Sequence, residues 1–141
     1  MERGSSSGMP DQAELLRART KQFALRVMRL CRTLPHTDEG HVIGRQLLRS
    51  STSVAANYRA MCRARSRPEF IAKLGVVVEE MDEVVFWLEL LTEGGIVPAA
   101  KIGPLSREAG ELLAIVTAAQ RTARSNVRSN PQILKSSNRQ I

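Results

Sequence analysis

The sequence predicts an all-α protein that folds as an antiparallel, up-down bundle of four long helices. Proline and glycine residues divide the 141-residue chain into four long segments. Apolar residues recur at spacings of three and four within each segment, as on one face of a helix, and no segment alternates as a strand would. The links between segments are short, which makes consecutive helices antiparallel neighbours.

The first helix is expected to run from Asp11 to Leu34. Asp11 follows Pro10 and can serve as the N-cap, and Pro35 ends the segment because proline cannot continue a helix. The apolar positions on one face are Leu16, Phe23, Val27, Leu30 and Leu34.

The second helix is expected to run from Asp38 to Arg65. Its first turns are the least sharply defined, because Gly40 and Gly44 fall there and glycine has a low helix propensity. Its apolar positions are Ile43, Leu47, Val54, Tyr58 and Met61.

The third helix has the clearest pattern. Ser66 is its expected N-cap, Pro68 and Glu69 fall in its first turn, and Gly94 follows its end. The spacing of its apolar positions alternates between four and three, which is typical of a helix-packing seam. These positions are Phe70, Leu74, Val77, Met81, Val84, Leu88 and Leu91.

The last helix is expected from Ile96 to Ser125, with Gly103 and Pro104 producing a kink or a delayed start. Its inward positions are expected to be Leu105, Leu112, Ile115 and Ala119. We therefore expect a bundle over residues 11–125. Residues 1–10 are rich in serine and glycine and are expected to be disordered, and residues 126–141, which contain no acid, are expected to form a mobile basic tail.

The charge of the chain favours polyanions as partners. Lysine and arginine number 21 against 14 aspartates and glutamates, which gives a formal net charge of +7. Residues 17–73 hold thirteen basic and three acidic side chains, whereas residues 79–93 hold six acids and no base. Most of the bases are arginines without a nearby acid in the sequence, and the planar guanidinium suits bidentate contacts with phosphate.

We therefore predict that arginines bind the phosphates of RNA or DNA. Such binding releases condensed counterions, so that it is salt-dependent and largely independent of base sequence. The few aromatic residues fall in or near apolar stripes, which does not support base stacking. The six candidates lie on the outer face of the first helix and around the turn between the second and third helices: Arg29, Arg32, Arg59, Arg63, Arg65 and Arg67.

A second apolar face on the third helix predicts a homo-oligomer. At 100° per residue Phe86 lies opposite Val77, and Leu90 lies close to Phe86. The first helix has a weaker second apolar face, because Leu25 and Met28 point away from its main apolar stripe. The expected interface residues are Leu25, Met28, Phe86 and Leu90. A loop or the C-terminal tail covering this face is the alternative.

A protein-interaction scaffold without nucleic-acid binding is an alternative function. The basic segment of one subunit could meet the acidic stretch of the third helix in a neighbouring subunit, and electrostatic complementarity alone would then explain both charged blocks.

The sequence contains no pattern of catalytic, metal-binding or cofactor-binding residues. The serines near position 50 lack a nearby histidine base, and His36 and His41 have neither a cysteine nor a third histidine close by. Cys31 and Cys62 are expected to be free thiols, and Asn57 is expected to fix helix register by hydrogen bonding. Neither a membrane span nor a secretion signal is found, so a cytoplasmic protein is expected.

Three segments resemble the four-helix-bundle family called the S23 ribosomal or 23S rRNA intervening-sequence proteins. They are Leu48 to Arg59, Ser66 to Leu74 and Phe86 to Leu91. The resemblance implies a bundle that assembles into a barrel-like homopentamer, and a likeness to the accessory variability protein of diversity-generating retroelements, which binds nucleic acid and partners a reverse transcriptase. It implies no catalytic residues. The chain departs from the family pattern at Ala60, where members usually have glutamate, and at Glu79, where lysine is common.

Overall fold

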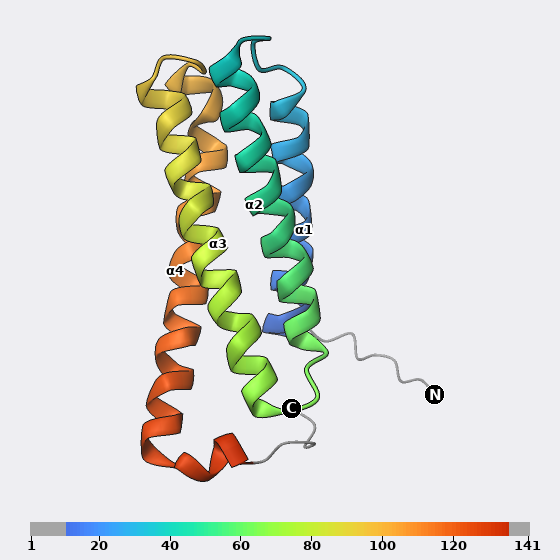
Figure 1. Ribbon diagram of the computed structural model, residues 1–141, viewed down its shortest axis with the longest axis vertical. Coiled ribbons are helices and arrows are strands. Elements are labelled where there is room, and N and C mark those ends of the chain that lie inside the picture. The colour runs from blue at the N-terminus through green and yellow to red at the C-terminus, as the bar shows by residue number, and fades with distance from the viewer. Residues whose placement is uncertain (1–10, 136–141) are drawn as a thin grey trace, which may run out of the picture.

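The computed structural model describes residues 11–135, which form four long helices and a short 3-10 turn, with no strand among them. The helices are α1 (Gln12–Cys31), α2 (Asp38–Cys62), α3 (Arg67–Glu93) and α4 (Ala99–Ser129), and the turn is η2 (Pro131–Lys135). Figure 1 shows them running alternately up and down, each beside the next in the chain. The predicted antiparallel four-helix bundle is confirmed.

The helices do not pack against each other equally. The α2–α3 pair forms the most extensive contact, α1 packs on α2 and α4 packs on α3, whereas α1 and α4 meet over a much smaller area. In Figure 1, α1 lies behind α2 and α4 lies behind α3. The bundle is therefore tightest through its middle pair and more open along the seam between its first and last helices.

The core is made by the apolar stripes that the sequence predicts, although Ile43 of α2 and Phe70 of α3 are only half-buried and α4 also has exceptions. Phe23, Val27, Leu47 and Leu74 are among the fully buried side chains. In α4, however, Ile115 is only half-buried and Ala119 is exposed. The buried residues of this helix recur at steps of three, four and seven, as in a heptad seam, and Ile115 lies one residue before Val116 of that seam. Its buried members are Ile102, Leu105, Ala109, Leu112, Val116 and Ala123.

Side-chain caps fix the beginnings of three helices. The Asp11 carboxylate accepts a hydrogen bond from the Glu14 amide at 2.8 Å, and the Ser66 hydroxyl accepts one from the Glu69 amide at 3.2 Å, as predicted. Thr37 caps α2 by accepting from the amide of Gly40 at 3.1 Å. Each cap satisfies a backbone N–H that has no partner within its helix.

The helix ends differ from the predicted ends. Both α1 and α2 stop three residues early, at Cys31 and Cys62. The chain turns there with backbone hydrogen bonds that span three residues instead of four, such as Leu34 N–H to Cys31 O. Pro104 lies inside α4, which begins at Ala99, so the proline does not delay the helix. Helix α4 also continues to Ser129, and η2 follows it. The expected tail is thus ordered as far as residue 135, while residues 1–10 and 136–141 lie outside the described part.

Candidate nucleic-acid interface

Two arginines are held by carboxylates of neighbouring helices. Arg49 of α2 contacts two acids of α3, Glu80 at 3.2 Å and Glu83 at 2.6 Å, and the Ser50 hydroxyl also donates to Glu83 at 3.2 Å. The hydrogen bond to Glu80 is the main cause that raises the pKa of Arg49. Burial is the next largest effect and lowers this pKa, and the attraction of both carboxylates adds to the rise. This arginine fastens α2 to α3.

Arg19 makes the equivalent contact between α1 and α4. Its guanidinium binds Glu108 in a bidentate manner, at 2.7 and 3.0 Å, and also lies 3.0 Å from Glu111. The hydrogen bond to Glu108 is the main cause that raises the pKa of Arg19. The expectation that the basic block lacks partners is therefore wrong for Arg19 and Arg49, because acids of distant helices reach them.

The six predicted arginines do not form ion pairs among residues 11–135. Arg29, Arg32, Arg59, Arg63 and Arg65 are exposed. Arg67 is half-buried, and its guanidinium lies 5.4 Å from the centre of the Phe70 ring, in a cation–π contact.

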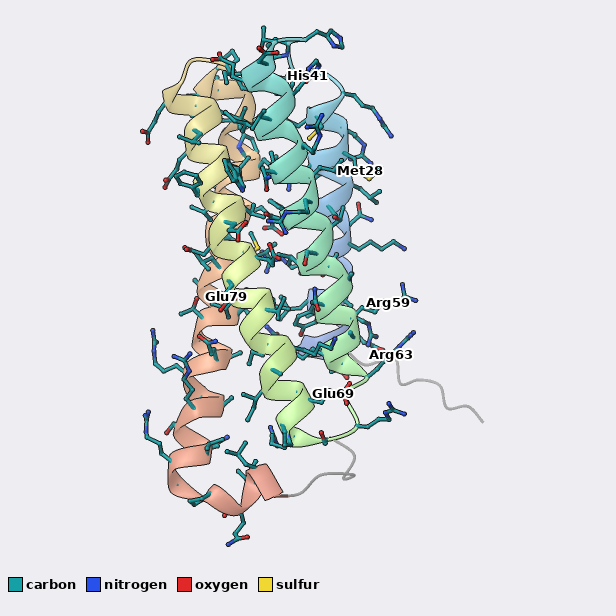
Figure 2. The ribbon with its side chains drawn as sticks, in the orientation of Figure 1. Met28, His41, Arg59, Arg63, Glu69 and Glu79 are labelled. Carbon is teal, nitrogen blue, oxygen red and sulfur yellow. The ribbon has the colours of Figure 1, made fainter. Side chains whose placement is uncertain are left out.

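A groove between α1 and α2 brings together four basic side chains. Arg17 and Lys21 line it from α1, and Arg59 and Arg63 line it from α2. On each helix the two residues are one turn, or roughly 6 Å, apart. The groove has a volume of about 960 Å³. Figure 2 shows Arg59 and Arg63 extending from the flank of the molecule that also carries Met28. We call this feature the α1–α2 basic groove.

The remaining lining of the α1–α2 basic groove consists largely of small or apolar residues. They are Ala18, Gln22, Ala24, Leu25, Thr52, Ala55 and Ala56. The single acid is Glu14, whose carboxylate lies 4.0 Å from Arg17, and both of these side chains are exposed to solvent. Such an exposed pair is weak. The groove therefore presents four cations and little opposing charge.

The structure separates the six predicted arginines into several places. Only Arg59 and Arg63 share the α1–α2 basic groove, whereas Arg29 lines a crevice between α1 and α4. Arg32 is at the C-cap of α1, and Arg65 lies in the turn between α2 and α3. The arginines predicted from the sequence do not include the groove residues Arg17 and Lys21. Their spacing of four residues, which puts both on one helix face, is the signal that could have identified them.

The predicted apolar face is exposed mainly at Phe86. This side chain is 48% exposed, and its ring lies 4.9 Å from that of Trp87 in an edge-to-face arrangement. Leu25, Met28 and Leu90 are half-buried. Leu25 lines the α1–α2 basic groove and so lies in the same place as the arginines.

Asn57 does not link helices through the hydrogen bonds of the structure. It is half-buried, and its amide donates to the backbone oxygen of Ser53 at 2.9 Å and to the Ser53 hydroxyl at 3.0 Å. Both bonds remain within α2. They satisfy the side chain locally but cannot set the register between helices, which corrects the expected role.

Cys31 and Cys62 are free and half-buried. Burial raises the pKa of the Cys31 thiol, which donates to the carbonyl of Gly44 at 3.5 Å. The rings of His36 and His41 lie 5.8 Å apart, edge to face. Between residues 11 and 135 no three histidine, cysteine or acidic side chains gather as metal ligands, and no helix there is long and apolar enough to cross a membrane.

Comparisons with known proteins support the resemblance found in the sequence. Residues 16–118 match the family model described as 23S rRNA-intervening sequence protein. The fold is similar to the crystal structure of a protein with unknown function from the S23 ribosomal protein family of Bacteroides thetaiotaomicron, with a TM-score of 0.72 and 27% sequence identity. The similarity covers 79% of this chain and 99% of that chain. A search of curated proteins found no match.

Proposed function

The chain belongs to the 23S rRNA-intervening sequence protein family, and we propose that it binds the phosphate backbone of RNA or DNA through the α1–α2 basic groove. The observation that carries the proposal is the convergence of four cationic side chains from two helices on one groove. Elsewhere in the bundle, Arg19 and Arg49 are occupied by carboxylates. The groove cations have no comparable internal partner and are left for an external anion.

The lining of the groove favours backbone contacts over base recognition. It contains no aromatic side chain on which a base could stack. Two arginines on α2 and an arginine and a lysine on α1 can contact phosphates on either side of a strand, and each neutralised phosphate releases counterions. Binding through such contacts is tight at low salt and insensitive to sequence.

The direct test is a titration of labelled RNA and DNA oligonucleotides, single-stranded and duplex, at two salt concentrations. We expect binding that weakens steeply as salt rises and that differs little between unrelated sequences. Failure to bind any of these oligonucleotides at low salt would refute the proposal.

A self-assembling interaction scaffold is the second candidate function, and the outer face of α3 favours it. Val76, Glu79, Phe86 and Leu90 lie within a stripe about 80° wide on this helix, and Phe86 is 48% exposed. Apolar residues flanked by acids are complementary to the α1–α2 basic groove, which combines four basic side chains with small and apolar ones. In this alternative α3 of one copy occupies the groove of the next and excludes nucleic acid.

Two finer properties come from the family resemblance. The homo-oligomer is proposed to be a pentamer, and the protein is proposed to assist a nucleic-acid enzyme such as a reverse transcriptase. The mass of the assembly in solution tests the first property. Co-purification with a reverse transcriptase encoded beside the gene tests the second.

A further inference from the structure

We infer that the crevice between α1 and α4 is a second anion site, one that holds a single phosphate group. It lies on the other side of α1 from the α1–α2 basic groove and does not depend on it. Three basic side chains line the crevice, Arg26 and Arg29 from α1 and Lys101 from α4. The other lining residues are Leu30, Thr33, Ile102, Pro104 and Leu105.

A hydrogen bond beside this crevice joins α4 to the turn that follows α1. The Lys101 ammonium donates to the hydroxyl of Thr33 at 3.3 Å, and that hydroxyl donates to the carbonyl of Leu30 at 2.8 Å. Lys101 is thereby directed from α4 towards α1, where Arg26 and Arg29 lie. Arg26 is half-buried, and partial removal of water strengthens its attraction for an anion.

Arg26, Arg29 and Lys101 form no ion pair within residues 11–135. The lining includes no acid. The two acids of α4, Glu108 and Glu111, are both bound by Arg19. Within α1 the one acid is Glu14, which is three helical turns away from Arg26. Three cations therefore face a crevice in which an external anion would supply the missing negative charge.

The size and charge of the crevice favour a phosphomonoester or a free phosphate ion. Its volume of about 280 Å³ falls below the range of roughly 300–1,000 Å³ for sites that hold larger ligands, and its apolar sides offer no partner for a base. A phosphomonoester carries close to two negative charges at neutral pH, whereas an internal phosphodiester carries one. Three cations gain more from the doubly charged group, so the terminal phosphate of a nucleic-acid strand fits the site better than an internal one.

The first experiment uses inorganic phosphate and the full chain. We expect saturable NMR shifts of the Thr33 and Lys101 signals at millimolar phosphate, measured against chloride at equal ionic strength. Arg26→Gln with Arg29→Gln should abolish them. Arg121→Gln with Arg124→Gln, which removes the same charge from exposed positions on α4 outside the crevice, should not. Absence of saturable shifts, or shifts that persist in the Arg26 and Arg29 variant, would overturn the inference.

The second experiment identifies the source of the phosphate. An oligonucleotide with a 5′-phosphate should bind roughly ten-fold more tightly than the same strand with a 5′-hydroxyl, through added charge-assisted hydrogen bonds. The difference should vanish in the Arg26 and Arg29 variant and persist in Arg59→Gln with Arg63→Gln. Equal affinities, together with retained phosphate shifts, would assign the site to the free ion. Binding of the 5′-hydroxyl strand reports on the α1–α2 basic groove. If this strand does not bind, the proposed function fails, whereas the shifts with inorganic phosphate still test the crevice.

Discussion

Arg19 shows how the environment of a single residue decides its role. Its guanidinium bridges Glu108 and Glu111, which are three residues apart on α4, whereas Arg59 has no carboxylate partner in the described chain. Both are arginines in the basic part of the sequence. Arg19 therefore links α1 to α4, and we propose that Arg59 binds an external partner.

The buried glycines at the start of α2 have a packing role that composition does not reveal. A Cβ atom at Gly40 would overlap the carbonyl oxygen of Pro35, and one at Gly44 would lie 2.8 Å from the Leu34 Cδ1 atom. The close approach lets the α1–α2 turn lie against the first turns of α2. The low helix propensity of glycine is outweighed by the close contact that its lack of a side chain permits.

Gly40→Ala should lower the free energy of unfolding by about 1–3 kcal/mol, because backbone atoms that cannot easily move must shift to admit the methyl group. Gly110→Ala is the matched control. Gly110 is in α4, and an added Cβ there meets nothing within 4 Å, so this variant should gain up to about 1 kcal/mol from helix propensity. Urea denaturation of both variants measures the effect. Equal changes in the two would contradict the packing role.

At the scale of the helix, periodicity and capping chemistry predict most of what the structure contains. The seam of α3 is buried at Leu74, Val77, Met81 and Leu88, and the Ser66 cap forms as expected. These features depend on residues that are close in sequence, and local spacing alone specifies them. The ends at Cys31 and Cys62 are less predictable because the final turns depend on how the next helix packs.

The candidate site depends on register between helices, which the sequence does not reveal. Arg59 and Arg63 can be selected because they are unpaired bases near a turn. Nothing local indicates that Arg17 and Lys21 face them across a groove, or that Arg49 instead meets acids more than thirty positions later. A charge count identifies a basic half of the chain, but only the packed helices separate structural arginines from free ones.

Ser66→Ala should destabilise the protein by about 1 kcal/mol, because the amide of Glu69 at the start of α3 loses its acceptor. Ser125→Ala is the control, since Ser125 is exposed in α4 and its hydroxyl forms no hydrogen bond in the described chain. Thermal or denaturant unfolding measures both. A Ser66 variant as stable as the Ser125 variant would show that the cap contributes nothing.

At the scale of the whole molecule, basic and acidic side chains are concentrated on different parts of the bundle, and the phenylalanine Phe86 is exposed. Arg59 and Arg63 of the α1–α2 basic groove lie on one flank in Figure 2, and Glu79 lies on α3 to their left. Phe86 is on the same acidic helix and is 48% exposed. The distribution suits either a surface for phosphate or a head-to-tail contact between copies.

Phe86→Glu should reduce the mass of any assembly in solution, because an interface would then bury an unpaired charge. Light scattering measures this mass. Val42→Glu is the matched control, since Val42 is 53% exposed and lies near the start of α2, not on α3. If both variants retain the mass of the unmodified protein, Phe86 is not part of an interface between copies.

The slope of log affinity against log salt concentration tests the central claim most directly. It should be measured with one oligonucleotide for the unmodified protein, for Arg59→Gln with Arg63→Gln, and for Arg121→Gln with Arg124→Gln. Each lost phosphate contact reduces the slope by roughly 0.7–0.9. We predict a slope shallower by up to about 2 for the Arg59 and Arg63 variant and little change for the α4 control. Identical slopes for all three proteins would contradict phosphate binding in the α1–α2 basic groove.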